Sequence, residues 1–431
     1  MDIRFRSIKG MNDILPDSSW RWILLENRLR RHFFMAGFKE IRTPILEYAE
    51  LFIRGIGEGT DIVDKEMYNF RDKDEQMVTL RPEGTASVVR AVVENNLLQQ
   101  DPVQRLFYLG PMFRYERPQK GRLRQFHQFG AEIFGIVDGS IDAELIYLGY
   151  SLLCSLEINK NDFVIKINSL GCANCRKSFR ARLVDFLNSK RDSLCEDCKR
   201  RIDTNPLRVL DCKNENCRMV TSDAPRVLDF LCEECSGHFQ QVRSSLNKFG
   251  VEYEVDHRLV RGLDYYSRTT FEIQVINNSL GSQNTVIAGG RYDSLFRDFI
   301  EKDYPAIGFA GGIERLMEII GRGVLKEEEI YKVSFISSAQ YIERDDIEIV
   351  ERLRSEGIVV EMDISDKSFK AKFKRADRFG AHLAIIKGED ESSGGYYSLK
   401  DLRVAIGSSD KQFKVPKGEL VKEIINRRRG L

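Results

Sequence analysis

The spacing of apolar residues near the N-terminus predicts a long first helix. Apolar side chains recur every three or four positions between residues 22 and 33, which is the period of one buried helix face. The expected inward residues are Trp22, Leu25, Leu29 and Phe33. Capping residues are available before them, at Asp17, Ser18 and Ser19, and Gly37 is suited to end the helix.

The next segments predict an antiparallel sheet. "KEIRTPILEYAELF" changes from strand to helix around Pro44, and a further helix is expected over 84–97. Three strand-like runs, "MVTLRP", "RLFYLGPMFRYE" and "RQFHQFGAEIFG", lie between residues 77 and 135. Only turns separate the second and third of these runs, and no crossover helix joins them. Neighbouring strands joined in this way favour antiparallel pairing.

Two changes of pattern then divide the chain. Residues 172–248 are charged, helical in pattern and nearly free of apolar strands, which indicates an insertion because strands resume at "VEYEVDHRLVRGLDYY". After a charged linker near 325–331, strands and helices alternate. This favours a separate α/β domain with a largely parallel sheet. The expected divisions are a main domain over 1–325, the insertion over 172–248 within it, and a C-terminal domain over 331–431.

Composition narrows the class of protein. A chain of 431 residues with 42% hydrophobic and 31% charged residues is typical of a soluble protein with more than one domain. The net charge of +1 gives no global attraction for nucleic acid, so such a partner would need local basic patches. No export signal or bilayer-length apolar run is present, so we expect a cytoplasmic protein without membrane contact.

Polar side chains are concentrated where the strands should be burying apolar ones. In "FRYERPQKGRLRQFHQFGAEIFG", Gln128 and Glu132 alternate with apolar residues, which indicates a polar floor on one face of a strand. Arg114 on such a platform could bind a phosphate. The simpler interpretation is a solvated, charged hairpin. Further polar residues interrupt the strand pattern in "VRGLDYYSRTTFE", which holds Arg261, Asp264, Tyr265 and Tyr266.

Two other segments begin helices. "PEGTASVVRA" puts Glu83, Gly84 and Thr85 at a helix start, where Thr85 as a cap is the simplest reading and ammonium binding is the alternative. "GFAGGIERL" has glycines followed by Arg315, which alone is a weak phosphate signal. "GGRYDSL", at 289–295, is read as another glycine-rich turn.

Together these segments resemble a class II aminoacyl-tRNA synthetase. The Pro44 segment looks like the first motif of that class, at a dimer interface, while the segments around Arg114 and Arg315 look like the second and third. "LVRGLDYYSRTTFE" and "GGRYDSL" resemble the two signatures of histidyl-tRNA synthetases, although Ser267 departs from their usual asparagine. The implied fold is α+β, with an antiparallel-sheet catalytic domain, a Cys-rich helical insertion and an anticodon-binding α/β domain.

The resemblance implies an enzyme that joins L-histidine to tRNA-His, using ATP and Mg²⁺, as a homodimer. Arg114, Arg261 and Arg315 would serve catalysis at the phosphates. The histidine-binding residues would be Glu83, Gly84, Thr85, Gln128, Glu132, Tyr265 and Tyr266. Contacts with the tRNA acceptor stem would come from Arg117, Gln119, Lys120, Arg122 and Arg124.

Two other functions are compatible with this fold. One is the non-catalytic, synthetase-like regulatory subunit of ATP phosphoribosyltransferase, which lacks an anticodon-binding domain. The other is an RNA-binding regulatory module. Arg114, Arg261, Arg315 and the hundred-residue C-terminal part argue against the first. The second would tolerate losses of active-site residues, and such losses are not seen. In that part, the segment "DKSFKAKFKRADRFG" predicts a helix. We expect Phe369, Phe373, Ala376 and Phe379 to point inward and Lys370, Lys372, Lys374, Arg375 and Arg378 to point outward, toward solvent or RNA.

The insertion carries eight of the nine cysteines, arranged as four close pairs. They are Cys172 and Cys175, Cys195 and Cys198, Cys212 and Cys217, and Cys232 and Cys235. Three pairs have the Cys-x-x-Cys spacing that lets two thiolates reach one Zn²⁺. Eight thiolates suffice for two tetrahedral sites, or for one site with spare thiols. The alternative is reduced thiols packed as small apolar side chains. By the resemblance, zinc is not needed for the shared chemistry.

Overall fold

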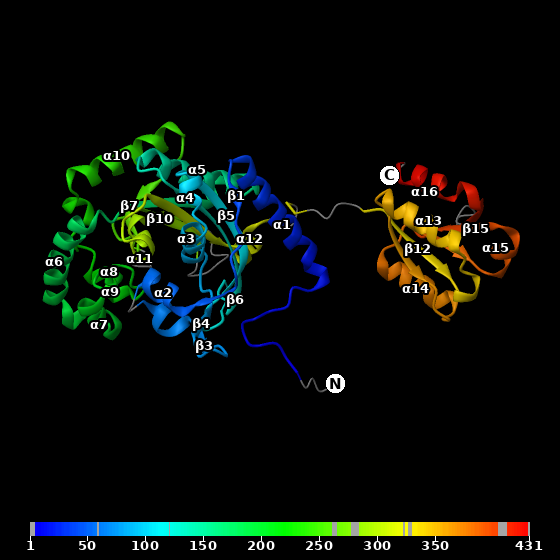
Figure 1. Cartoon of the computed structure of the whole chain (residues 1–431), viewed down its shortest axis with the longest axis horizontal. Coiled ribbons are helices and arrows are strands. Elements are labelled where there is room, and N and C mark those ends of the chain that lie inside the picture. The colour runs from blue at the N-terminus through cyan, green and yellow to red at the C-terminus, as the bar shows by residue number, and fades with distance from the viewer. Residues whose placement is uncertain are drawn as a thin grey trace. The chain divides into compact units, whose positions relative to one another are not determined.

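The computed structural model describes residues 5–57, 60–119, 121–260, 265–276, 284–321, 324–325, 330–403 and 412–429. Among the predicted site residues, Lys120 and Arg261 lie outside these ranges, as does Asp264. The chain forms two compact units, Met1–Lys326 and Glu327–Leu431 (Figure 1). Within the described ranges, every helix is too short or too polar to cross a bilayer.

The first helix, α1 (Pro16–Met35), buries the face that its apolar spacing predicts. Leu25, Leu29 and Phe33 are fully buried. The predicted caps are wrong, because Leu15 is the N-cap residue and no side chain caps the helix. Pro16 takes the first helical position, where its missing N–H has no partner to lose. The helix therefore begins at least two residues earlier than a cap at Asp17, Ser18 or Ser19 would place it.

The first unit is built on an eight-stranded sheet in the order β1-β5-β6-β11-β10-β9-β7-β8. Pairing is antiparallel from β5 through to β7 and parallel at the two edges, which confirms the predicted fold class. In the same order the strands are Lys39–Glu40, Gln104–Phe113, Gln125–Phe134, Ala306–Gly312, Thr285–Arg291, Ser267–Val275, Phe163–Ser169 and Glu254–Val255.

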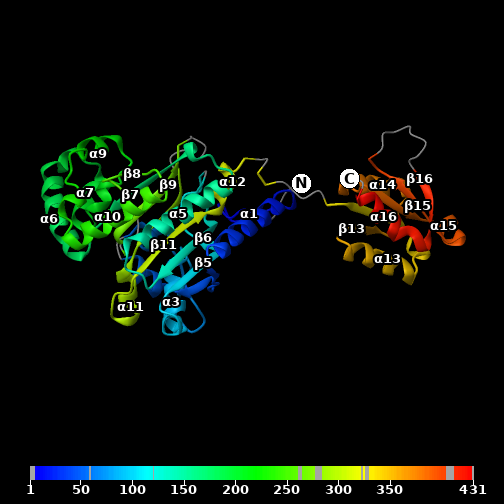
Figure 2. The same cartoon turned by 90° about the horizontal axis from the view of Figure 1, so that it is seen from above.

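Helices cover both faces of this sheet (Figure 2). On one face, α1, α5 (Gly139–Ser155) and α12 (Ile313–Ile319) pack on a core that includes Phe107, Phe129 and Phe309. On the other face, α3 (Thr85–Glu94) packs with Leu106 and Tyr108. Glu132 pairs with Leu106 in the strand register and therefore points toward the α3 face, where the site lies.

A smaller sheet and several short elements complete the body of the first unit. The small sheet has the order β2-β4-β3, and its strands are Leu46–Tyr48, Met77–Leu80 and Tyr68–Arg71. The other helices are α2 (Ala49–Ile56), α4 (Leu97–Gln100), α11 (Arg297–Ile300), a π-helix (Ile62–Glu66) and 3₁₀ turns at Lys160–Asp162 and Asp293–Phe296. "GGRYDSL" is thus not a turn. Its first three residues end β10.

The insertion is helical, as its sequence predicts. Its helices are α6 (Ala173–Ser189), α7 (Glu196–Thr204), α8 (Leu207–Leu210), α9 (Glu215–Val220) and α10 (Glu233–Lys248), with 3₁₀ turns at Arg191–Ser193 and Val227–Phe230. No strand occurs between residues 172 and 248, all of which the structure describes. The last helix, α10, packs against α5 and so joins the insertion to the core of the unit.

The second unit is a five-stranded sheet in the order β13-β12-β14-β15-β16. The strands are Val359–Asp363, Lys332–Ser337, Leu383–Lys387, Tyr396–Asp401 and Gln412–Pro416. Helices are α13 (Arg344–Ser355), α14 (Phe369–Phe379), α15 (Glu389–Gly394) and α16 (Leu420–Arg429), with 3₁₀ turns at Ala339–Tyr341 and Lys417–Glu419. Only β13, β12 and β14 are parallel, so a largely parallel sheet is wrong for the last two strands.

Candidate functional site

The centre of the site is a carboxyl group with no access to solvent. Glu132 on β6 is fully buried, and it accepts hydrogen bonds from Thr85 Oγ1 (2.9 Å) and Tyr292 Oη (2.5 Å). Burial raises the pKa of Glu132 to about 8, against the opposing effect of the two hydroxyl donors. Near neutral pH this carboxyl therefore holds its proton in the absence of a ligand.

The neighbouring strand makes room for that carboxyl by carrying no side chain. Gly308 on β11 lies opposite Glu132 in the register, and a Cβ atom at Gly308 would lie 1.5 Å from Glu132 Oε2. Moving the glutamate side chain by a few tenths of an ångström could not relieve such an overlap. Gly308 of "GFAGG" thus makes room for the polar floor, whereas Gly312 lies beside Arg315.

The side chain that caps the start of α3 is that of Glu83 and not, as the sequence suggests, that of Thr85. The Glu83 carboxylate accepts from the N–H groups of Thr85 (2.6 Å) and Ala86 (2.8 Å), so Glu83 closes the start of α3. The N-cap residue is Gly84, and no side chain of that residue or of Thr85 caps the helix. Thr85 as the cap is wrong, because its hydroxyl donates to Glu132. Burial raises the pKa of Glu83.

Three tyrosines form an aromatic wall beside the two glutamates. Ring centroids of Tyr265 and Tyr266 are 4.7 Å apart, and those of Tyr265 and Tyr292 are 5.6 Å apart. All three side chains are buried. Tyr292 follows β10 directly and had no predicted role, although the "GGRYDSL" signature contains it.

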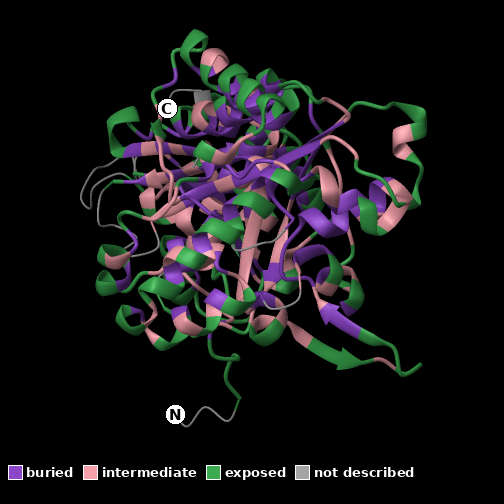
Figure 3. Ribbon diagram, turned by 90° about the vertical axis from the view of Figure 1, so that its left-hand side faces the viewer, coloured by how far each residue is buried: buried purple, intermediate pink, exposed green. Residues whose placement is uncertain are grey.

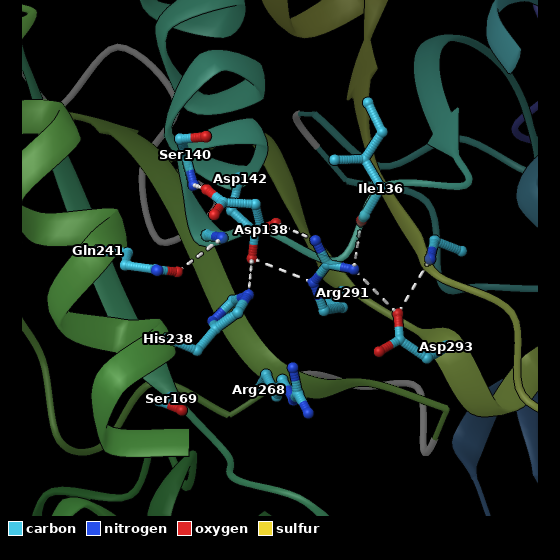
Figure 4. A network of polar contacts seen from close by, with 12 residues as sticks. Ile136, Asp138, Ser140, Asp142, Ser169, His238, Gln241, Arg268, Arg291 and Asp293 are labelled. Carbon is cyan, nitrogen blue, oxygen red and sulfur yellow. Dashed lines mark hydrogen bonds and ion pairs between the residues drawn. The ribbon is translucent and has the colours of Figure 1, made fainter. Parts of the chain in front are cut away.

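A buried ion network around Arg291 holds the end of β10 in place (Figure 4). Tyr292 is the next residue along the chain, so the network also fixes its backbone. Arg291, which has no exposed surface, binds Asp142 on α5 through two nitrogens and Asp293 through a third, 3.2 Å away. Asp293 also accepts from the N–H of Ala306 on β11. His238 of α10 lies 3.5 Å from Asp142, and burial lowers its pKa.

Cationic side chains converge above this floor. Arg114 donates to Pro82 O (2.9 Å) from the end of β5, and Arg315 donates to Thr285 O (2.7 Å) and Gly121 O (3.2 Å) from α12. The pKa of Arg315 is lowered by burial first and then by the positive charges of Arg122 and Arg114. Like charges held so close together create a potential that favours an anion.

The predicted acceptor-stem residues differ in exposure. Arg117 and Gln119 are exposed in the loop between β5 and β6. Arg122 is half-buried and forms an ion pair with Glu116 (3.0 Å). Arg124 is also half-buried and lies over the Tyr115 ring, 3.9 Å from its centroid. The last two arginines therefore already have partners within the protein.

These groups border one cavity of about 820 Å³. Its lining includes the predicted residues Glu83, Thr85, Arg114, Arg122, Gln128, Tyr265, Tyr266 and Arg315. Glu132 is not among the described lining residues, but it is hydrogen-bonded to Thr85, which does line the cavity. Arg201, Arg208 and Lys213 of the insertion also reach the cavity, which no local pattern could indicate because they lie far along the chain from the other lining residues.

Comparison with known proteins agrees with this geometry. The family model for histidyl-tRNA synthetase matches residues 10–316, and that for an anticodon binding domain matches residues 332–427. A histidine–tRNA ligase of Geobacter sulfurreducens is 48% identical over 402 residues, covering 93% of this chain and 95% of that protein. A histidine–tRNA ligase of Halothermothrix orenii is 47% identical over 405 residues, covering 94% and 95%.

A solved structure extends the likeness to the fold. The apo histidyl-tRNA synthetase of S. aureus superposes with a TM-score of 0.77 at 32% identity, covering 97% of this chain and 99% of that one. The described lining residues of the cavity run from Glu83 to Arg315, so all of them fall within the region 10–316 that the histidyl-tRNA synthetase model matches. The chain therefore belongs to the histidyl-tRNA synthetase family.

Proposed function

We propose that the chain activates L-histidine with ATP to form histidyl-adenylate and transfers the histidyl group to the 3′ end of tRNA-His. One observation carries this proposal: clustered arginines line the same cavity as the buried carboxyl of Glu83 and the buried rings of Tyr265 and Tyr266. One side suits phosphates and the other suits a polar, aromatic side chain. Catalysis is assigned to residues 1–325, with the insertion 172–248 within them, and anticodon reading to residues 331–431.

The arginines act in the first step. A carboxylate oxygen of histidine attacks the α-phosphorus of ATP, and the bond from that phosphorus to the pyrophosphate oxygen breaks. Arg114 and Arg315 neutralise charge that develops on the phosphates, and Arg261, which lies outside the described residues, is proposed to share this role. Mg²⁺, when bound with ATP, neutralises the leaving pyrophosphate. The Glu272 carboxylate, which also lines the cavity, supplies the type of oxygen ligand that this ion prefers.

The floor selects the amino acid. Tyr266 and Glu132 are proposed partners for the two imidazole nitrogens, with Tyr265 along the wall. Glu83, Thr85 and Gln128 would hold the α-ammonium beside Gly84. Since Glu132 carries its proton when no ligand is present, it can donate to a ring nitrogen or transfer that proton to it. An analogue without ring nitrogens cannot make these hydrogen bonds, and a site built to hydrogen-bond its substrate typically rejects such an analogue by about four orders of magnitude in kcat/KM.

The tRNA contacts fall on two parts of the chain. The exposed Arg117 and Gln119, together with Lys120, are proposed for the acceptor stem, while Arg122 and Arg124 can join only by leaving their present partners. The second unit is proposed to bind the anticodon, as the match to an anticodon binding domain supports. This match also disfavours the regulatory subunit of ATP phosphoribosyltransferase as the function.

We also propose a homodimer formed through the small β2-β4-β3 sheet. Leu46 and Tyr48 on β2 and Phe70 on β3 lie on one face of this sheet by register, and each is more than 40% exposed. Figure 3 shows the exposed strand β3 beside the more buried β4. Apolar side chains gathered on one face of a sheet are typical of a surface that another chain covers.

The test is histidine-dependent exchange of pyrophosphate into ATP, measured with a panel of amino acids. We expect exchange with histidine alone. Arg114→Ala or Arg315→Ala should lower kcat by about a hundredfold or more, with a smaller effect on the KM for histidine, because the lost contact is made mainly in the transition state. Arg31→Ala, on an exposed residue of α1 that does not line the cavity, is the matched control. Exchange with another amino acid, or near-normal exchange by the two variants, contradicts the assignment.

A further inference from the structure

We propose that the insertion binds two zinc ions, each held by four cysteine thiolates. The fold brings the four close pairs together two by two. The base cluster consists of Cys172, Cys175, Cys232 and Cys235, and the cavity cluster consists of Cys195, Cys198, Cys212 and Cys217. Within each cluster all sulfur atoms lie within 4.8 Å of one another. This pairing does not follow from the sequence, which leaves one or two sites open.

Three of the four cysteine pairs have the same local geometry. Cys172, Cys195 and Cys232 are the N-cap residues of α6, α7 and α10, and each has its partner cysteine in the first turn of that helix. The Cys-x-x-Cys spacing therefore puts both sulfurs at one helix start. The positive end of a helix dipole favours the thiolate that a metal requires.

A hydrogen bond from backbone to sulfur recurs in both clusters. The N–H of Cys232 donates to Cys175 Sγ (3.1 Å), and the N–H of Cys195 donates to Cys217 Sγ (3.2 Å). In each case the first cysteine of one pair donates to the second cysteine of the other pair. Such outer contacts orient metal ligands in built sites. The acceptors, Cys175 and Cys217, are buried, so they are held where an ion would need them.

The distances fit a single tetrahedral ion. Four Zn–S bonds of about 2.3 Å place neighbouring sulfurs about 3.8 Å apart. The Sγ atoms of Cys172 and Cys175 are 3.5 Å apart, and those of Cys195 and Cys212 are 3.9 Å apart. Gly171 permits the base arrangement, because its φ is +65° and a Cβ there would lie 2.5 Å from Cys175 Cβ.

Packing of thiols as small apolar side chains does not explain this arrangement. Cys232 is exposed, and Cys172, Cys195 and Cys212 are only half-buried, whereas apolar packing favours full burial. The base cluster also joins the first and last helices of the insertion, at the starts of α6 and α10. An ion there would close a long loop in a helical segment that has no sheet of its own.

The base cluster is connected to the histidine pocket. Arg176, next to Cys175, donates to the Tyr266 backbone oxygen (3.2 Å), and Gly171 O accepts from the N–H of Arg268 (3.0 Å). The cavity cluster contributes Cys195 and Cys212 to the cavity lining. The zinc sites are nevertheless proposed from the cysteine geometry alone and stand whether or not the proposed reaction does.

The test begins with elemental analysis of the full chain, purified without a metal-binding tag. We expect two zinc ions per chain. Cys235→Ser and Cys198→Ser should each leave one ion, in the cavity and base clusters respectively, and the double variant should leave none. Cys154→Ser, which changes the exposed cysteine outside both clusters, should keep two. Cys235→His should recover zinc, because imidazole is also a zinc ligand.

Thiol titration of the unmodified chain gives a second readout that does not depend on how the variants fold. Of the nine thiols, only Cys154 should react quickly in the native protein, and the other eight should react once a strong chelator has removed zinc. Cobalt should replace zinc and give the absorption of tetrahedral thiolate coordination. Iron in place of zinc, one zinc per chain, or eight native thiols that react without a chelator would each overturn the two-site proposal.

Discussion

Glu132 connects burial, charge and specificity at the scale of one residue. Both carboxylate oxygens have hydroxyl partners, yet burial holds the pKa near 8. A chain that folds around such a group binds a proton that the unfolded chain releases above its usual pKa of 4.5. The buried Glu132 carboxyl therefore makes the folded chain less stable at neutral and higher pH than at low pH.

This linkage gives a prediction for Glu132→Gln. Stability due to the raised pKa is fully present below about pH 4.5 and is lost as pH rises through about 8. Between these limits the free energy of unfolding of the first unit should fall by about 1.4 kcal/mol for each unit of rising pH, relative to that of the glutamine variant, which has no carboxyl to titrate at this position. Urea unfolding from pH 5 to pH 9 measures the difference. Glu94→Gln, exposed on α3, is the control, and a difference that stays flat over this range contradicts the raised pKa.

At the scale of elements, the second unit separates its helices between two faces of one sheet. Helix α14 packs on Ile336 and Ala384 on one face, while α13 and α16 pack on the opposite face with Val333 and Ile385 (Figures 1 and 2). The predicted inward position of Ala376 is confirmed. The predicted inward position of Phe369 is wrong, because Phe369 is exposed. The predicted outward position of Lys372 is also wrong, because Lys372 is buried with its ammonium donating to Ser337 O.

The exposed charges of α14 give the second prediction. Replacing Lys370, Lys374 and Arg378 by alanine should weaken tRNA binding and aminoacylation but leave pyrophosphate exchange unchanged. Each lost phosphate contact should also reduce the salt dependence of binding by about one unit of log K per log salt concentration. The matched control is Arg352→Ala with Lys422→Ala, exposed residues of α13 and α16 on the opposite face. Equal losses in both half-reactions would mean that these side chains support the fold.

Lys372 must be kept out of that set, and it gives a prediction of its own. Lys372→Ala removes a buried hydrogen bond to Ser337 O and should lower the stability of the second unit by about 1–3 kcal/mol. Thermal unfolding, followed with and without tRNA, separates this loss from a loss of RNA contacts. Unchanged stability would mean that the buried ammonium and its hydrogen bond contribute no net stability, and would contradict this prediction.

Local pattern predicted most of the elements but few of the partners that complete the site. Strand alternation and helical spacing gave the sheet, the insertion and the inward face of α1, because each is fixed by neighbours within a few residues. The contacts Thr85–Glu132 and Tyr292–Glu132 join distant segments, so a cap and a turn were the readings that local pattern favoured. Likewise, the position of Lys372 in its helix does not indicate that its ammonium will be buried and will donate to the distant carbonyl of Ser337.

At the scale of the whole molecule, the small β2-β4-β3 sheet gives the remaining prediction. Leu46→Glu or Phe70→Glu places a charge on the proposed dimer surface and should convert a particle of twice the 49.8 kDa chain mass into a monomer. Light scattering measures this mass. Met219→Glu, on an exposed residue of the insertion, should have no effect. A wild-type monomer, or variants that remain dimeric, would contradict the interface.

The place of the insertion in the sheet has a consequence for how the chain folds. Strands β7 and β9 are direct neighbours, with Ser169 paired to Thr269, yet the whole insertion lies between them in sequence. Closing a flexible loop of about a hundred residues slows such a pairing. Helices form quickly from local contacts. An insertion that becomes compact first would therefore bring the two strands together as if a short turn joined them. The insertion would then fold before β7 and β9 pair in the sheet.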